Sequence, residues 1–164
     1  MRELIGAVLL IGGTAFCGAA AARRLAIRAR VLAALTSAVG VMQAEISFGY
    51  TALPVIFAKL ADAYPNLSGL FRPCAAALTG DSRLEDRLNA GLSTLPLKPD
   101  EREVLRELGS VGRYDAESSA ALMERIKLRV SDFAERAREE QREKSRLYGF
   151  MGAAAGIAIT ILII

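Results

Sequence analysis

The sequence of 164 residues contains no histidine. This absence removes the side chain that most often serves as a general acid–base or a metal ligand near neutral pH. The sequence also lacks a CxxC pair, a glycine-rich phosphate loop followed by lysine, and a GxSxG motif. We therefore predict no metal, no cofactor and no small-molecule substrate, and we expect a protein that is not an enzyme.

Cysteine is scarce, with Cys17 in an apolar run and Cys74 in the charged middle of the chain. This pair does not indicate a disulfide-stabilised protein. Cys74 has no imidazole to activate it, which favours a core thiol. Glu45 lies beside an apolar helical stripe, where a solvated, cap-linked or interface carboxylate fits better than a buried proton carrier. An enzyme that uses Glu45 or Cys74 is the alternative that these residues leave open.

Charge is missing from residues 4–22 and 147–164. A membrane-spanning helix needs about 20 apolar residues, and both runs are close to that length. We predict an N-terminal transmembrane anchor in residues 1–23, a middle domain in 24–146, and a C-terminal transmembrane helix in 147–164. An alternative is that the first run is a cleaved secretory signal, which would make the chain an exported, tail-anchored domain.

Cations flank both apolar runs on their inner sides. Arg23 and Arg24 follow the first run directly, and a cluster of arginines and lysines in 136–146 precedes the second. Basic residues beside membrane helices favour the cytoplasmic side, so the middle domain should be cytoplasmic. The net charge of +3 is modest and no basic stripe with interleaved aromatics is present, so we expect no nucleic-acid partner.

The middle domain has helical periodicity throughout and no alternating strand pattern. Apolar residues spaced three and four apart predict a helix from about residue 24 to 48, continuous with the first anchor. Thr51 and Asn66 are suited to cap the next two helices, and Pro99 to begin a later one. Residues 116–148 contain neither Gly nor Pro, which predicts one long helix that enters the second anchor. We predict an all-α fold with a bundle of roughly six helices.

Several segments, in order along the chain, resemble one known family. They are the start Met1–Leu10 with Arg23-Arg24-Leu25, the central stretch Gln43-Ala-Glu-Ile-Ser-Phe-Gly-Tyr-Thr-Ala-Leu-Pro54, and the later Ala137-Arg-Glu-Glu-Gln141 with Leu147-Tyr148. The whole chain resembles the stage III sporulation protein AB family. It departs from the family pattern at Ala52, where Pro is expected, and at Ser119, where Gln is usual.

This resemblance implies a role in endospore formation and no catalytic residues. The family's genes belong to an operon whose products form a secretion-like channel between mother cell and forespore. Its soluble domain is similar to the cytoplasmic helical domain of type II secretion platform proteins. The resemblance therefore implies a membrane scaffold on the mother-cell side of the outer forespore membrane, with the channel's other subunits and its cytoplasmic ATPase as partners. A general membrane adaptor or assembly factor unrelated to sporulation is the alternative.

Two outer surfaces of the predicted bundle are candidates for partner binding. One surrounds the end of the first long helix, and the other follows the charged face of the last helix. The candidate residues are Glu45, Tyr50, Thr51, Asp132, Arg136, Glu139 and Glu140.

Overall fold

The computed structural model describes residues 2–49, 51–76, 83–111 and 116–163. Side chains are described in 19–47, 51–76, 84–111 and 118–144, and at Leu147. Within these residues the chain is helical and contains no strand, as predicted. Of the predicted features, Tyr50 lies outside the described residues.

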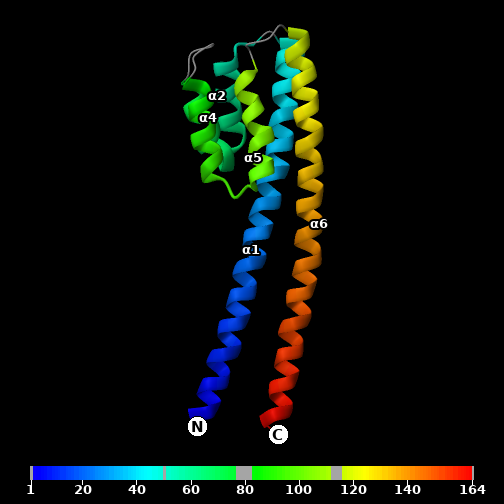
Figure 1. Cartoon of the computed structure of the whole chain (residues 1–164). Coiled ribbons are helices and arrows are strands. Elements are labelled where there is room, and N and C mark those ends of the chain that lie inside the picture. Colours follow the sequence, from blue (N-terminus) through cyan, green and yellow to red (C-terminus); the bar gives the residue numbers. More distant parts are fainter. Residues whose placement is uncertain (1, 50, 77–82, 112–115, 164) are drawn as a thin grey trace.

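Two long helices form the frame of the molecule. Helix α1 spans Arg2–Ala44 and α6 spans Ala116–Ile163. They run antiparallel beside each other, and both chain ends lie together, far from the bundle (Figure 1). Both helices pass without interruption through the predicted domain boundaries near 23 and 147, which confirms the predicted continuity.

Four shorter helices pack on one side of this pair, at the end opposite to the chain termini (Figure 1). A π turn, η1, continues α1. One 3-10 turn, η2, lies between α2 and α3, and a second, η3, directly extends α5. In chain order these elements are η1 (Glu45–Gly49), α2 (Leu53–Ala63), η2 (Pro65–Leu67), α3 (Ser68–Ala75), α4 (Arg83–Thr94), α5 (Pro99–Arg106) and η3 (Glu107–Ser110).

The α1–α6 contact is the most extensive between any two elements and forms half of the core. The apolar stripe predicted here, Leu32, Leu35, Val39, Met42 and Ile46, faces the core: the first four are buried, and Ile46, in η1, is partly buried. On α6 the apolar residues spaced three and four apart, from Leu122 to Ala137, predict the buried face. Of these, Ile126, Val130 and Ala137 are buried as expected, whereas Leu122 and Phe133 are only partly buried. Met123 and Ala134 are buried in addition, so the buried face is slightly rotated from the prediction. Besides α1, helix α6 packs against α5, η3 and η1, and these contacts accompany the rotation.

The other half of the core joins α2, α3 and α4. Phe57 of α2 and Phe71 of α3 stack with their ring centroids 6.1 Å apart. Helices α3 and α4 approach each other closely at Gly91, where an added Cβ would lie 3.0 Å from the Cα of Leu70. This backbone contact requires a residue without a side chain.

Two predicted helix caps are wrong. Helix α2 begins after Ala52, which makes no side-chain cap, and the Thr51 hydroxyl instead donates to Glu45. Asn66 lies inside η2, and α3 begins after Leu67. Pro99 begins α5 as predicted. The local sequence favours Thr51 and Asn66 as caps, but in the folded protein Ala52 precedes α2 and Leu67 precedes α3.

Candidate interaction surface

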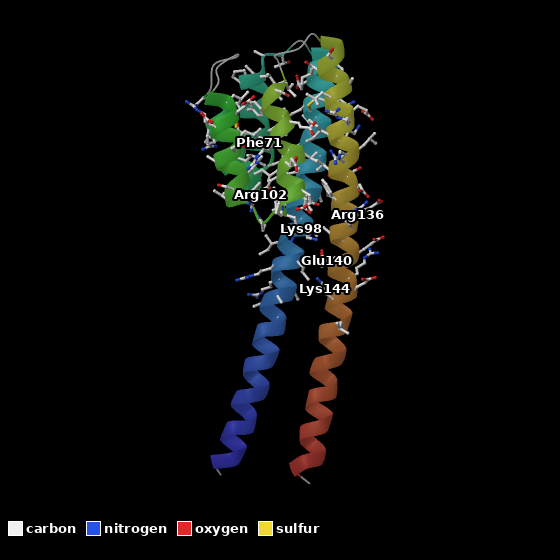
Figure 2. The ribbon with its side chains drawn as sticks, in the orientation of Figure 1. Phe71, Lys98, Arg102, Arg136, Glu140 and Lys144 are labelled. Atoms are coloured by element: carbon white, nitrogen blue, oxygen red, sulfur yellow. The ribbon has the colours of Figure 1, made fainter. Side chains whose placement is uncertain are left out.

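A cluster of ionic side chains joins α1, α5 and α6 where the two long helices leave the bundle. Arg28 of α1 pairs with Glu101 of α5 and, at 2.8 Å, with Glu140 of α6. Glu140 also contacts the ammonium groups of Lys98 at 3.3 Å and Lys144 at 2.6 Å. Figure 2 shows Lys98, Glu140 and Lys144 together at this level. We call these five residues the basal ionic cluster.

Glu101 is held in place by the first turn of α5. Pro99 suits the first helical position because its missing N–H would have no partner there. The Glu101 carboxylate then accepts a hydrogen bond of 2.8 Å from the backbone N–H of Lys98. Its side chain is 1% exposed and that of Arg28 is 11% exposed. Since a buried carboxylate needs a charged partner and hydrogen bonds, this local cap and the Arg28 pair together make its burial tolerable.

The Glu140 carboxylate is strongly biased toward its charged form. The Lys144 ammonium lowers its pKa most; burial opposes this effect, and Arg28 and Lys98 lower the pKa further, to about 2. Glu140 is therefore an anion throughout the physiological pH range. Its carboxylate binds three cations: Arg28 of α1, Lys144 of α6 and Lys98 of the loop before α5.

The predicted surface residues near the end of α1 lie at the other end of the bundle. Glu45 is partly exposed and accepts hydrogen bonds from Lys59 at 2.7 Å and from Thr51 at 2.6 Å. These two donors, Lys59 first, lower the pKa of the Glu45 carboxyl. Glu45 thus links α1 to α2. A carboxylate with a lowered pKa is a weak base near neutral pH, which disfavours a role in proton transfer.

The predicted residues on α6 divide into two groups. Asp132, Arg136 and Glu139 are exposed, and Asp132 pairs with Arg136 at 2.8 Å. Glu140 lies on a different face and belongs to the basal ionic cluster. The structure therefore does not bring all seven candidate residues together. The exposed face of α6 also carries Leu128 and Glu135, and we call Leu128, Asp132, Glu135, Arg136 and Glu139 the outer α6 stripe.

Arg28 and Glu101 are important residues that sequence reasoning missed. Neither residue stands out in the sequence as part of a site. The available signal was local: Glu101 follows Lys98 with the spacing of a carboxylate that caps the first turn of a helix. Nothing local indicated that Arg28, 73 residues earlier, would bind it.

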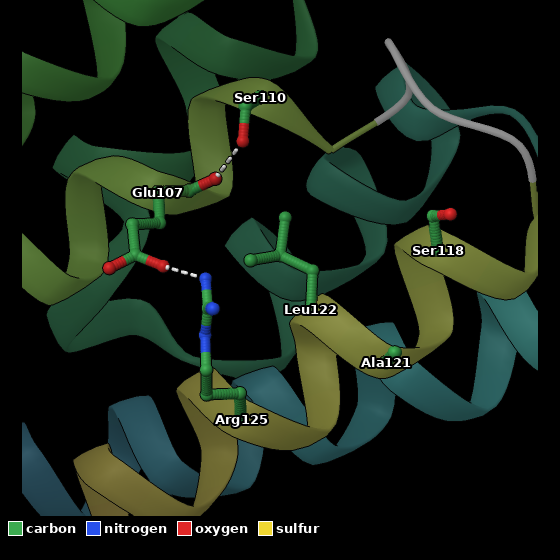
Figure 3. Close-up of a pocket in the computed structure, with 6 residues that line it drawn as sticks. All are labelled: Glu107, Ser110, Ser118, Ala121, Leu122 and Arg125. Atoms are coloured by element: carbon green, nitrogen blue, oxygen red, sulfur yellow. Dashed lines mark hydrogen bonds and ion pairs between the residues drawn. The ribbon is translucent and has the colours of Figure 1, made fainter.

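A hollow lies between η3 and the start of α6 (Figure 3). It measures about 740 Å³ and is open to solvent. Its polar groups bind each other: Arg125 pairs with Glu107 at 2.7 Å, and the Ser110 hydroxyl donates to the Glu107 carbonyl. Its other lining residues are Ser118, Ala121 and Leu122. None of these side chains forms a nucleophile–base pair.

Cys74 is not activated as a nucleophile. The Cys74 thiol is buried, donates to the Leu70 carbonyl, and burial raises its pKa to about 11. A thiol with so high a pKa is a poor nucleophile. Among the described residues, no group of three or more His, Cys, Asp or Glu is arranged to hold a metal ion.

One stretch within the described residues, Ala19–Ser47, is long and apolar enough to cross a membrane. It overlaps the predicted first anchor only at that anchor's end, and 39% of its most apolar 18-residue segment is buried inside the protein. The buried part includes Leu32 and Leu35 of the bundle core. Length and composition alone do not separate a core helix from a membrane helix, so this stretch indicates membrane association without setting the topology.

The fold and these surfaces define a class of all-helical protein in which an antiparallel pair of long helices carries a cap of four short ones. The family model described as stage III sporulation protein AB matches residues 3–164, and the chain belongs to this family. It is 26% identical over 170 residues to the stage III sporulation protein AB of Bacillus subtilis (strain 168), covering 99% of each chain. No solved structure matches.

Membership in this family confirms the resemblance noted from the sequence and supports a role in sporulation. The family is not known as a family of enzymes. Together with the membrane-helix candidate near the N-terminus, membership also supports association with a membrane.

Proposed function

We propose that this chain is a membrane scaffold subunit of the secretion-like channel between mother cell and forespore, and that its bundle docks the channel's cytoplasmic ATPase. Family membership over nearly the whole chain supports the sporulation role. The channel and the ATPase come from the family resemblance. The similarity to type II secretion platform domains is an analogy at the level of fold class.

The arrangement of the two chain ends carries the membrane part of the proposal. Helices α1 and α6 extend beyond the bundle in the same direction, and their ends lie together (Figure 1). Residues 4–22 and 147–163 have no charge and occupy these extensions. Two such helices would enter one bilayer from the same side, with the bundle on the side where the flanking cations lie.

The outer α6 stripe is the proposed docking surface. Its residues are exposed, and three of its four charged residues are acidic. Leu128 adds an apolar contact point among them. A patch with an apolar residue inside a rim of charge is suited to bind a basic surface, because the charges steer the encounter and the apolar contact adds affinity.

The membrane topology is tested by thiol labelling in intact cells that produce the chain outside sporulation. A single cysteine replaces the exposed Asp100, and Cys17→Ala removes one native thiol. Cys74 is retained because it is buried and its pKa is about 11. Protection from an impermeant maleimide until lysis is expected. Labelling before lysis would place the bundle outside the cytoplasm and favour the exported, tail-anchored alternative.

The docking surface is tested by a charge reversal of Asp132, Glu135 and Glu139 to lysine in the full chain. We expect loss of co-purification with the ATPase and loss of spore formation, with normal membrane insertion. The matched control reverses Asp62, Asp86 and Glu103, three exposed carboxylates on α2, α4 and α5. If the outer-stripe variant retains the ATPase as well as the control does, the docking surface lies elsewhere.

A further inference from the structure

The end of the bundle that faces the chain termini collects cations from three separate elements. Arg23 and Arg24 come from α1, Lys98 from the loop between α4 and α5, and Arg142 and Lys144 from α6, and all five are exposed. Figure 2 shows Lys98 and Lys144 at the level where the two long helices leave the bundle. We call these five residues the basal cations. Lys98 joins them only through the fold, because it is far from both apolar runs in sequence.

Both long helices place this end of the bundle at the same height above the predicted membrane. Arg28 and Glu140 share an ion pair of 2.8 Å, so they lie at one level. At about 1.5 Å rise per residue, Arg28 is about 9 Å from residue 22 along α1, and Glu140 is about 10 Å from residue 147 along α6. The lipid headgroup region adds about 5–7 Å to each side of the hydrocarbon core. Exposed side chains at this level, including Lys98, therefore reach the headgroups.

Part of the positive charge here is not neutralised by the protein. Arg28, Lys98 and Lys144 share the carboxylates of Glu101 and Glu140. Among the described side chains, Arg23, Arg24 and Arg142 form no ion pair, although the exposed Glu143 follows Arg142 in sequence. Cations therefore outnumber carboxylates at this end of the bundle.

Exposed apolar side chains accompany these cations. Ile27, between Arg24 and Arg28, is 48% exposed, and Leu147 is 57% exposed. A soluble surface gains nothing from such residues, whereas a membrane interface buries them while the neighbouring cations remain at the headgroups. Leu147 begins the predicted second anchor, so in a membrane an apolar layer lies directly beside these cations, and other polyanions offer no such layer.

We propose that the basal cations, with Ile27 and Leu147, form a binding face for anionic phospholipid headgroups that seats the bundle on the bilayer in which the chain is anchored. The inference rests on the membrane topology of the proposed function, but not on ATPase docking. The negative potential of an anionic leaflet attracts such a cluster within about one Debye length, roughly 8 Å. Because Lys98 belongs to the face, the α4–α5 loop points toward the membrane and the outer α6 stripe remains in solvent.

The test uses the full chain in nanodiscs of phosphatidylcholine alone or mixed with phosphatidylglycerol. The thermal midpoint of the bundle is followed by helical circular dichroism. A lipid that binds only the folded face raises this midpoint, and we expect a rise of about 4 °C with phosphatidylglycerol that disappears at high salt. Equal midpoints in the two bilayers would overturn the proposal.

The charge requirement is tested with Arg23→Gln/Arg24→Gln/Arg142→Gln. These side chains form no described ion pair, so the midpoint in phosphatidylcholine should not change, whereas the rise with phosphatidylglycerol should be lost. The matched control, Arg72→Gln/Arg106→Gln/Arg129→Gln, removes three exposed cations elsewhere and should retain the rise. A rise that persists in the first variant would overturn the role of these cations.

Failure of this inference is distinguishable from failure of the proposed function. A chain that alkaline carbonate removes from vesicles would refute both the topology and the lipid face. A chain that inserts and binds its ATPase, yet shows no response to phosphatidylglycerol, would refute the lipid face alone. Nanodiscs expose both leaflets, so a change of topology caused by the loss of Arg23 and Arg24 would not alter this readout.

Discussion

The Arg28 guanidinium of α1 and the Glu101 carboxylate of α5 form an ion pair that is almost completely removed from water. The pair joins the helix that leads toward the chain terminus to the first turn of a short helix in the cap. Glu140 of α6 binds the same guanidinium. One arginine therefore links the cap to both long helices.

Breaking this pair on one side should destabilise the bundle strongly. Arg28→Met leaves the buried Glu101 carboxylate without its cation, at a cost of about 3–5 kcal/mol. Glu101→Leu should cost less, because Arg28 keeps Glu140 as an ionic partner. The double variant should cost less than the sum, because neither charge remains buried alone. Unfolding of the full chain in detergent measures the coupling. Additive effects would contradict it, and the exposed pair Asp132–Arg136 serves as a control with an expected coupling of about 0.5 kcal/mol.

Glu140 should make stability depend on acid pH. Its pKa is about 2 in the folded protein, against an ordinary value of 4.5. Its contribution to stability is therefore complete above about pH 5 and is lost as the pH falls toward 2. The shift corresponds to about 3 kcal/mol, which contact with water at 26% side-chain exposure reduces to about 1–2 kcal/mol. Glu140→Gln should be destabilised by this amount at pH 7 and converge with the native chain near pH 2. Glu139→Gln is the exposed control, and an equal loss in both variants would exclude the cluster as the cause.

Gly91 should not tolerate a methyl group, whereas Gly69 should. A Cβ at position 91 would lie 2.7 Å from Leu70 Cδ1 and 3.0 Å from its Cα, and the backbone contact cannot move aside without separating α3 from α4. Gly91→Ala should therefore cost about 1–3 kcal/mol. An added Cβ at Gly69 meets nothing within 4 Å, so Gly69→Ala in α3 should be neutral or stabilise by up to about 1 kcal/mol. Thermal unfolding of both variants distinguishes them, and similar midpoints would show that the α3–α4 contact can relax.

The Cys74 thiol should resist modification in the folded protein. It is buried and its pKa is about 11, so its thiolate population at pH 7.5 is very small. In a Cys17→Ala chain, a maleimide should label Cys74 only after denaturant is added. An added exposed cysteine in place of Asp100 is the positive control. Labelling of Cys74 at a similar rate in the native state would reveal local opening of α3.

The sequence predicted the long elements well because their signal is local. The apolar stripe from Leu32 to Met42 repeats every three or four residues, and the core buries all of it. The uninterrupted run after residue 116 predicted α6 for the same reason. Cap residues were less predictable. Thr51 has the side chain of a helix cap, but the Glu45 carboxylate competes for its hydroxyl.

The candidate surface was predicted only in part. Exposure along α6 follows from charge at helical spacing, so Asp132, Arg136 and Glu139 are on the surface as expected. Glu140 differs by one residue from Glu139, and that step rotates it by about 100° toward α1 and Lys98. Charge patterns do not reveal which carboxylates on a helix have a partner distant in sequence, because neighbouring residues point in directions about 100° apart.

By itself the sequence determined the helical class, the two long helices, their separation into charged and uncharged parts, and the resemblance to the sporulation family, since each depends on residues close together in the chain. The tertiary structure alone decided that Arg28 binds Glu101 and Glu140 across three helices, that Lys98 joins the cations of α1 and α6, and that Gly91 lies against Leu70. These contacts join residues distant in sequence. They form only once the helices have been brought together, which costs backbone entropy, so local sequence patterns do not reveal them.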